Sequence, residues 1–73
     1  MNVRYALYID ANKAFLKNIN TNKLDYEVIC ISEKDGLIKV KAINFMDTIR
    51  MYISSIDNFN SDIMKNILPE CYL

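Results

Sequence analysis

The side chains that could carry chemistry in this chain are carboxylates, tyrosines, lysines and two cysteines, because histidine is absent. Its absence removes the usual general base of Ser and Cys triads. Asp25 and Glu27 could act as paired acids on one strand face, but alternating acids are more typical of a solvated face. Cys71 follows Glu70, and a negative neighbour disfavours a reactive thiolate. We therefore expect no catalytic residues and predict that the protein is not an enzyme.

Metal and nucleotide sites are disfavoured by the same composition. The two cysteines form no CxxC motif, and without histidine they cannot complete a tetrahedral zinc site. Cys30 lies in an apolar run and is expected to be a small buried hydrophobe, while Cys71 lies in the tail. No disulfide is expected between them, because nothing in the sequence indicates an oxidising compartment. One glycine cannot build a phosphate-binding loop, so we expect no cofactor and no metal.

The charge and the apolar content of the chain favour a protein partner over a nucleic acid. Nine Lys+Arg balance nine Asp+Glu, so no net charge attracts a polyanion. Hydrophobic residues make up 52% of the chain, against roughly 45–50% in globular proteins. A domain of this size buries only about 60% of the surface that its unfolded chain exposes. We therefore expect some apolar side chains to remain outside the core.

The sequence shows no targeting or membrane segment. The first apolar stretch is interrupted by Arg4 and closed by Asp10, and no segment approaches the roughly 18 uninterrupted apolar residues of a membrane span. These patterns predict a cytoplasmic protein with no membrane partner. Asparagine and isoleucine are abundant, a bias expected of an AT-rich genome. Short chains with this bias and no enzyme signature often belong to phages or other mobile elements, and we adopt that origin as a background expectation.

One small domain over residues 1–73 must position these side chains, since the chain contains no linker and no repeat. Apolar and polar residues alternate over residues 3–9, which predicts a half-buried strand. Residues 11–19 fit either a helix capped by Asp10 or the second strand of a hairpin that turns at Ala11-Asn12. We favour the helix, because the strand would mix apolar and charged residues on one face.

Residues 24–43 carry the strongest local signal, a β-rich run, the Asp35-Gly36 tight turn and a second alternating run. This pattern predicts an antiparallel hairpin. Its register stays open, because a two-residue loop aligns Ile31 with Val40 whereas a bulged turn aligns Cys30 with Val40.

Two helices are expected at the C-terminal end. Asn44 can cap a helix whose apolar residues fall on one side over residues 45–56, and Asn60 can cap a last helix that ends at Pro69. The sequence thus predicts an α+β fold with a small antiparallel sheet of three strands and two C-terminal helices packed on it. Residues 11–19 add a short helix after the first strand or, in the alternative, a fourth strand.

The candidate partner-binding residues are those that this arrangement leaves outside the core. Met51 lies away from the apolar side of the first C-terminal helix, and Cys71, Tyr72 and Leu73 follow the helix end. We interpret them as the surface of a small non-enzymatic protein-binding module, whose partner is another protein or a second copy in a homodimer. Our hypothesis is a phage or mobile-element accessory protein that inhibits or modulates a host protein.

The alternative is a small nucleic-acid-binding regulator that uses Lys39 and Lys41, which point the same way from one strand. A strand followed by two helices resembles the element order of ribbon-helix-helix DNA-binding proteins. In those proteins the reading strand pairs with its copy in a dimer, whereas the Asp35-Gly36 turn ties this strand to the preceding one. We therefore rank this function second and expect replacement of the two lysines to matter little.

Overall fold

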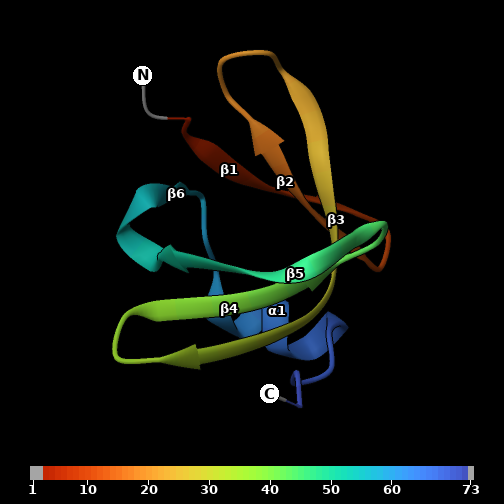
Figure 1. Ribbon diagram of the computed structural model, residues 1–73, viewed down its shortest axis with the longest axis vertical. Helices are drawn as coiled ribbons and strands as arrows, with labels where there is room; N and C mark the ends of the chain where they lie inside the picture. The colour runs from red at the N-terminus through yellow and green to blue at the C-terminus, as the bar shows by residue number, and fades with distance from the viewer. Residues whose placement is uncertain (1–2, 73) are drawn as a thin grey trace.

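Six strands of one mixed sheet dominate the fold in the computed structural model, which describes residues 3–72 (Figure 1). The elements are β1 (Tyr5–Asp10), β2 (Lys13–Asn18), β3 (Lys23–Lys34), β4 (Leu37–Ala42), β5 (Phe45–Tyr52), a short 3₁₀ helix (Ile53–Ser55), β6 (Ile56–Asp57) and α1 (Ser61–Ile67). Strands β1 to β5 form an antiparallel meander, and β6 pairs with β1 in parallel. The predicted sheet of three or four strands with two C-terminal helices was therefore wrong.

The segment predicted as a helix over residues 11–19 is strand β2, so the hairpin alternative holds. Ala11 occupies a turn position with φ of 55°, and β1 pairs with β2 from there back to Asn18. The mixed face that argued against a strand points to solvent. On it Phe15 packs against Tyr8 with ring centroids 6.2 Å apart, and the Lys17 ammonium lies 5.7 Å from the Tyr8 ring centroid. Aromatic and cation–π contacts thus let apolar and charged residues share one face.

The first C-terminal helix, predicted over residues 45–56, is absent: the segment forms strand β5, the 3₁₀ helix Ile53–Ser55 and the start of β6. Asn44 has a φ of 63°, which is a turn conformation, whereas the residue that caps a helix N-terminus has an extended backbone. The spacing of the apolar residues in this segment fits both a helix and a strand, and its aromatic and β-branched content favours the strand. In β5, Ile49 and Met51 lie opposite Val40 and Ile38, both fully buried.

Two predictions of local structure are confirmed. Asp35 and Gly36 have φ values of 53° and 77°, and Ile31 lies opposite Val40, which is the register of the two-residue loop. The last helix begins after Asn60, whose side chain accepts a hydrogen bond from the backbone N–H of Ile63 at 3.0 Å. These signals depend on a few adjacent residues, so distant contacts could not override them.

Strand β3 bends the sheet into two layers that enclose the core. Its first half pairs with β2 and its second half with β4, and β-bulges interrupt the two ladders near Lys17 and between Val28 and Cys30. Figure 1 shows β1 and β2 crossing β4 and β5 at a steep angle, with α1 behind the sheet. The core contains Leu7, Ala14, Leu16, Val28, Ile31, Ile38, Val40, Ile56 and Met64.

The hairpin turns provide a test of the fold. Gly36→Ala should lower the free energy of unfolding by about 1 kcal/mol, because an L side chain is disfavoured at positive φ; a Cβ there would touch nothing within 4 Å, so sterics add no further cost. Ala11→Gly should raise it, by up to about 1 kcal/mol, for the same reason. Urea-induced unfolding measures both. A destabilising Ala11→Gly change would instead support a helix over residues 11–19.

Candidate interaction surfaces

The structure separates the residues predicted to bind a partner. Met51 packs against the core from β5, so it is not the exposed helical residue that the sequence predicted. Cys71 is 7% exposed, while Tyr72 is fully exposed at 100%. Leu73 lies outside the described residues. Of this set only Tyr72 presents an open side chain, and it forms no cluster with Met51.

Cys71 forms a disulfide with Cys30, contrary to the sequence-based expectation. Their Cα atoms are 5.0 Å apart. The tail reaches Cys30 because β2 leaves the edge of β3 uncovered after Val28. There the backbone N–H of Ile31 donates to the Pro69 carbonyl at 3.1 Å, and the N–H of Cys71 donates to the Ile31 carbonyl at 3.2 Å. The tail thus adds a short parallel bridge to β3, a long-range pairing that no local pattern signals.

The disulfide also removes one support for the predicted cytoplasmic location. That prediction relied in part on an absence of signs of an oxidising compartment, and disulfides persist mainly in oxidising environments. Over residues 3–72 no helix has the length and apolar character needed to cross a bilayer.

The outer side of strands β3, β4 and β5 carries a basic face, defined by Lys34, Lys39, Lys41 and Arg50. Lys39 lies directly opposite Arg50 of β5 and opposite Ser32 of β3. These positions alternate along the strands with Ile38 and Val40, which point into the core. The prediction that Lys39 and Lys41 share one side is confirmed, and Arg50 was missed because its segment was expected to be helical.

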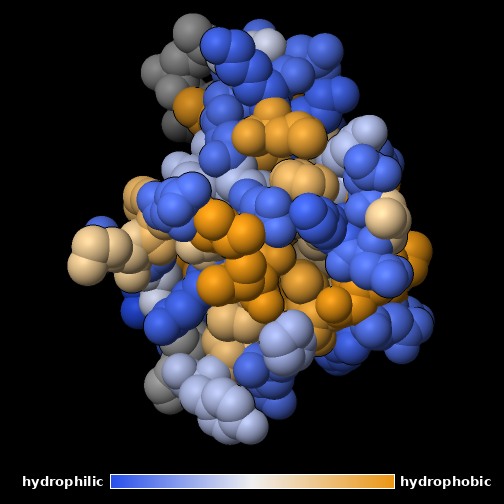
Figure 2. Space-filling model, turned by 90° about the vertical axis from the view of Figure 1, so that its right-hand side faces the viewer, coloured by the Kyte–Doolittle hydropathy of each residue, from blue (hydrophilic) through white to orange (hydrophobic). Residues whose placement is uncertain are grey.

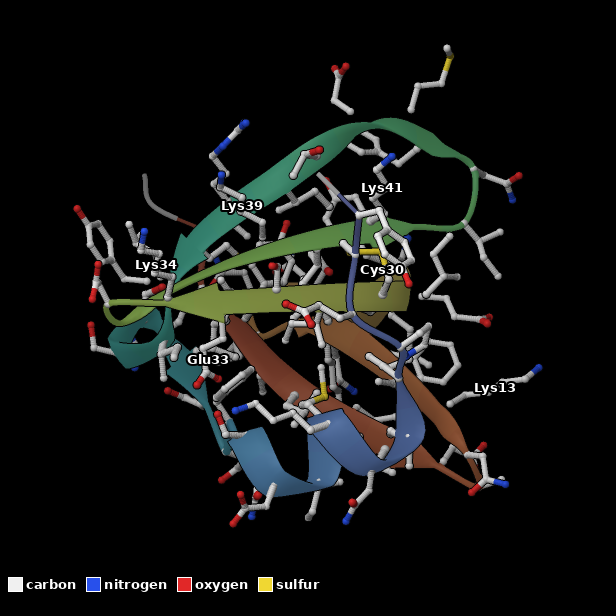
Figure 3. All side chains as sticks on the ribbon, turned by 90° about the horizontal axis from the view of Figure 1, so that it is seen from below. Lys13, Cys30, Glu33, Lys34, Lys39 and Lys41 are labelled. Atoms are coloured by element: carbon white, nitrogen blue, oxygen red, sulfur yellow. A yellow bond between two sulfur atoms is a disulfide. The ribbon has the colours of Figure 1, made fainter. Side chains whose placement is uncertain are left out.

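Glu33, the acidic residue in the second half of β3, points to the other side of the sheet. Glu33 lies opposite Ile38 and accepts a hydrogen bond from the Ser61 hydroxyl, while the Lys65 ammonium lies 3.9 Å from its other carboxylate oxygen. Figure 3 shows Lys39 and Lys41 on one side of the sheet and Glu33 on the other, next to α1. Alternation along β3 and β4 therefore places Lys39 and Lys41 on one side of the sheet and Glu33 on the other.

An apolar groove lies where the β4–β5 turn meets β2 and β3. It is lined by Phe15, Leu24, Asp25, Tyr26, Glu27, Ile43, Asn44 and Phe45. The turn is attached to β3 by a hydrogen bond from the Ile43 N–H to the Glu27 carbonyl at 2.9 Å. Met46, which follows the lining residue Phe45 in the sequence, does not line the groove itself and is 97% exposed. Figure 2, which views the side of the molecule with the β4–β5 turn, shows hydrophobic residues gathered across its middle.

A row of three aromatic rings supports the floor of this groove. Tyr26 lies 5.5 Å from Phe45 and 5.9 Å from Tyr5, measured between ring centroids. Burial raises the pKa of Tyr5, and the nearby Tyr26 and Asp25 raise it further. Tyr26 of β3 and Phe45 of β5 line the groove, and Tyr5 of β1 packs against Tyr26.

A second depression lies beside α1, and its polar side chains already contact one another. It is lined by Ile31, Glu33, Ser61, Met64, Lys65, Leu68 and Glu70. Its central carboxylate, Glu33, already interacts with Ser61 and Lys65. Within residues 3–72 no group of three or more His, Cys, Asp or Glu side chains is placed to hold a metal ion.

Comparisons with known proteins match nothing to this chain, whether made against models of protein families, against curated proteins or against solved structures. Function must therefore be inferred from the basic face and the apolar groove themselves.

The disulfide should contribute strongly to stability. It joins residues separated by 41 positions, and a loop of that size gives about 4 kcal/mol in the chain-entropy model. We expect Cys30→Ser with Cys71→Ser, or reduction of the native protein, to lower the free energy of unfolding by about 2–4 kcal/mol. Urea unfolding with and without reductant measures the change. Two titratable thiols in the denatured, unreduced protein would contradict the disulfide.

Proposed function

We propose that this protein is a small non-enzymatic protein-binding module whose partner docks on the apolar groove and Met46. The supporting observation is the concentration of exposed apolar side chains there, since Leu24, Ile43 and Phe45 are each at least 40% exposed and Met46 is almost wholly so. Large apolar patches on small domains are typical of interaction sites. The aromatic row beneath gives the groove a rigid floor, which reduces the ordering cost of binding.

Met46 is the side chain that would lose the most solvent exposure when a partner binds. Full burial of a Met side chain is worth about 1.5–3 kcal/mol, and Met adapts its shape to irregular surfaces. Because Met46 lies in the stretch of β5 where the ladder is interrupted, between the pairs Ala42–Phe45 and Val40–Ile49, a partner can cover it without disturbing the pairing of β4 and β5. We infer that Met46 and Phe45 together form the anchor of the interface.

The charges at the groove favour a partner segment that combines apolar and basic residues. Asp25 and Glu27 line it, and no basic side chain among the described residues does so. In a two-fold dimer through this groove, the same carboxylates would face each other, which disfavours a second copy. We therefore propose a different protein as the partner, in keeping with our hypothesis of a phage or mobile-element product that inhibits or modulates a host protein.

Met46→Gln tests the proposal, because it keeps the side-chain length while adding a polar amide. Loss of the buried apolar contact should weaken partner binding roughly 10- to 100-fold. The tagged protein would be cross-linked in cells of its source, and co-purified proteins would be identified by mass spectrometry. Recovered partners would then be titrated with the purified variants by calorimetry.

Ile63→Gln is the matched control, since Ile63 is an exposed apolar residue of α1, an element that contributes no residue to the groove. A partner that binds the native protein and the Ile63→Gln variant equally, and the Met46→Gln variant weakly, supports the proposal. Equal binding by all three, or loss of binding only with Ile63→Gln, would overturn it. Circular dichroism must show the same fold for each variant.

A further inference from the structure

We propose that the basic face is a binding site for the sugar-phosphate backbone of a single-stranded nucleic acid. This inference goes beyond the proposed function, because it concerns another surface and another class of ligand. The face consists of three lysines labelled in Figure 3, Lys34, Lys39 and Lys41, together with Arg50, and the strand register places Tyr52 at one border. It extends over the outer sides of β3, β4 and β5, beyond the groove that the protein partner would cover.

The strand register fixes the spacing of the cations. Lys39 and Arg50 are directly opposite each other, so their Cα atoms are about 4.5–5.5 Å apart. Lys41 follows Lys39 two residues along β4, a step of about 6.8 Å at the usual rise of an antiparallel strand. Lys34 and Tyr52 both lie opposite Leu37, one on each side of it, at the β3–β4 turn end of the face. The face therefore presents cations at successive positions along and across the strands, as a chain of phosphates requires.

No ion pair of the described residues involves the four cations of the basic face, and exposed acids on the same elements include Asp35 in the β3–β4 turn and Asp47 in β5. In residues 3–72 the ion pairs within 4.0 Å join Arg4 to Asp57 and Lys65 to Glu33, and neither involves the basic face. Like charges directly opposite on neighbouring strands disfavour folding, so the Lys39–Arg50 pair opposes the sheet unless an anion lies between them. A bound phosphate would convert this repulsion into two charge-assisted hydrogen bonds.

The composition of the face fits a nucleic acid better than an acidic protein. Lysine is depleted at protein–protein interfaces, whereas lysine, arginine and hydroxyl side chains supply most contacts to phosphates. Ser32 stands in the same row as Lys39 and Arg50. At the border Tyr52 is 64% exposed, and its ring takes part in none of the aromatic pairs found in the described chain.

Tyr52 is the reason to specify a single strand. An open tyrosine ring can stack on a base only when that base is not already stacked within a duplex. Its position beside the Lys34–Leu37 row would place the stacked base at the end of the phosphate path. DNA and RNA share the backbone charge and the base faces that this site would recognise, so both belong in the test.

Fluorescence anisotropy with labelled 12-nucleotide dT and rU strands measures the binding at several salt concentrations. Four phosphate contacts predict a slope of log K against log salt of about −3. Lys39→Gln with Lys41→Gln should reduce its magnitude by about 1.4 and weaken binding on the order of tenfold at low salt. Tyr52→Leu should weaken binding at least about fivefold while leaving the slope unchanged, because stacking releases no counterions.

Lys13→Gln with Lys23→Gln is the charge-matched control, since both residues are exposed at the starts of β2 and β3, away from the basic face. Retained binding by this control, with the losses described, supports the site. Equal losses in both double variants would overturn it, as would tighter binding to duplex than to single strands. Unchanged binding by the Tyr52→Leu variant would also overturn it. Equal binding of polyglutamate would overturn it too, and would indicate an acidic protein as the ligand.

The two binding surfaces can be tested separately. Met46→Gln carries no charge change, so it should leave oligonucleotide binding intact. Lys39→Gln with Lys41→Gln should leave binding of a groove partner within about twofold, because rim charges outside a contact contribute little. Failure of one surface therefore does not imply failure of the other.

Discussion

The bend of β3 is the constraint on which the rest of the structure depends. Twelve residues in one strand cannot pair along their full length with both neighbours, because β2 and β4 are six residues each and meet it at opposite ends. The bulge between Val28 and Cys30 bends β3 at the point along it where pairing with β2 stops and pairing with β4 starts. This turn brings Leu16 and Val40 from different halves into one core. It also leaves the edge of β3 free for the tail.

The same bend creates both surfaces. By folding the sheet, it moves the β4–β5 turn against β3, where Ile43 bonds to Glu27 and the apolar groove forms. It also makes the outer side of β3, β4 and β5 a separate face, on which only every second residue appears. Since Lys39 alternates with Ile38 and Val40, burial of the core forces the cations outward together. The net charge of zero therefore says little about the field at any one face.

The sequence was a good guide to turns and helix caps. It was a poor guide to whether the longer segments form helices or strands. The Asp35-Gly36 turn and the Asn60 cap each depend on adjacent residues, and both are confirmed. Asn44 failed as a guide because asparagine serves equally as a helix cap and as a left-handed turn residue. Asn22, Asn44 and Asn58 all have positive φ, so the asparagine content, first interpreted as genome bias, also supplies turns. Recognising that role would have predicted more strands and fewer helices.

The tail illustrates why the candidate site could be only partly inferred. Cys71 follows a helix end, and its pairing with Cys30 requires β3 to turn away from β2 and expose the backbone of Ile31. Cys30 lies opposite Lys41, so the disulfide borders the basic face. A covalent link at that border limits how far the tail can move across the cations. Because this link joins residues 41 positions apart, no residue next to either cysteine signals it, so the position of the tail could not be inferred from the sequence.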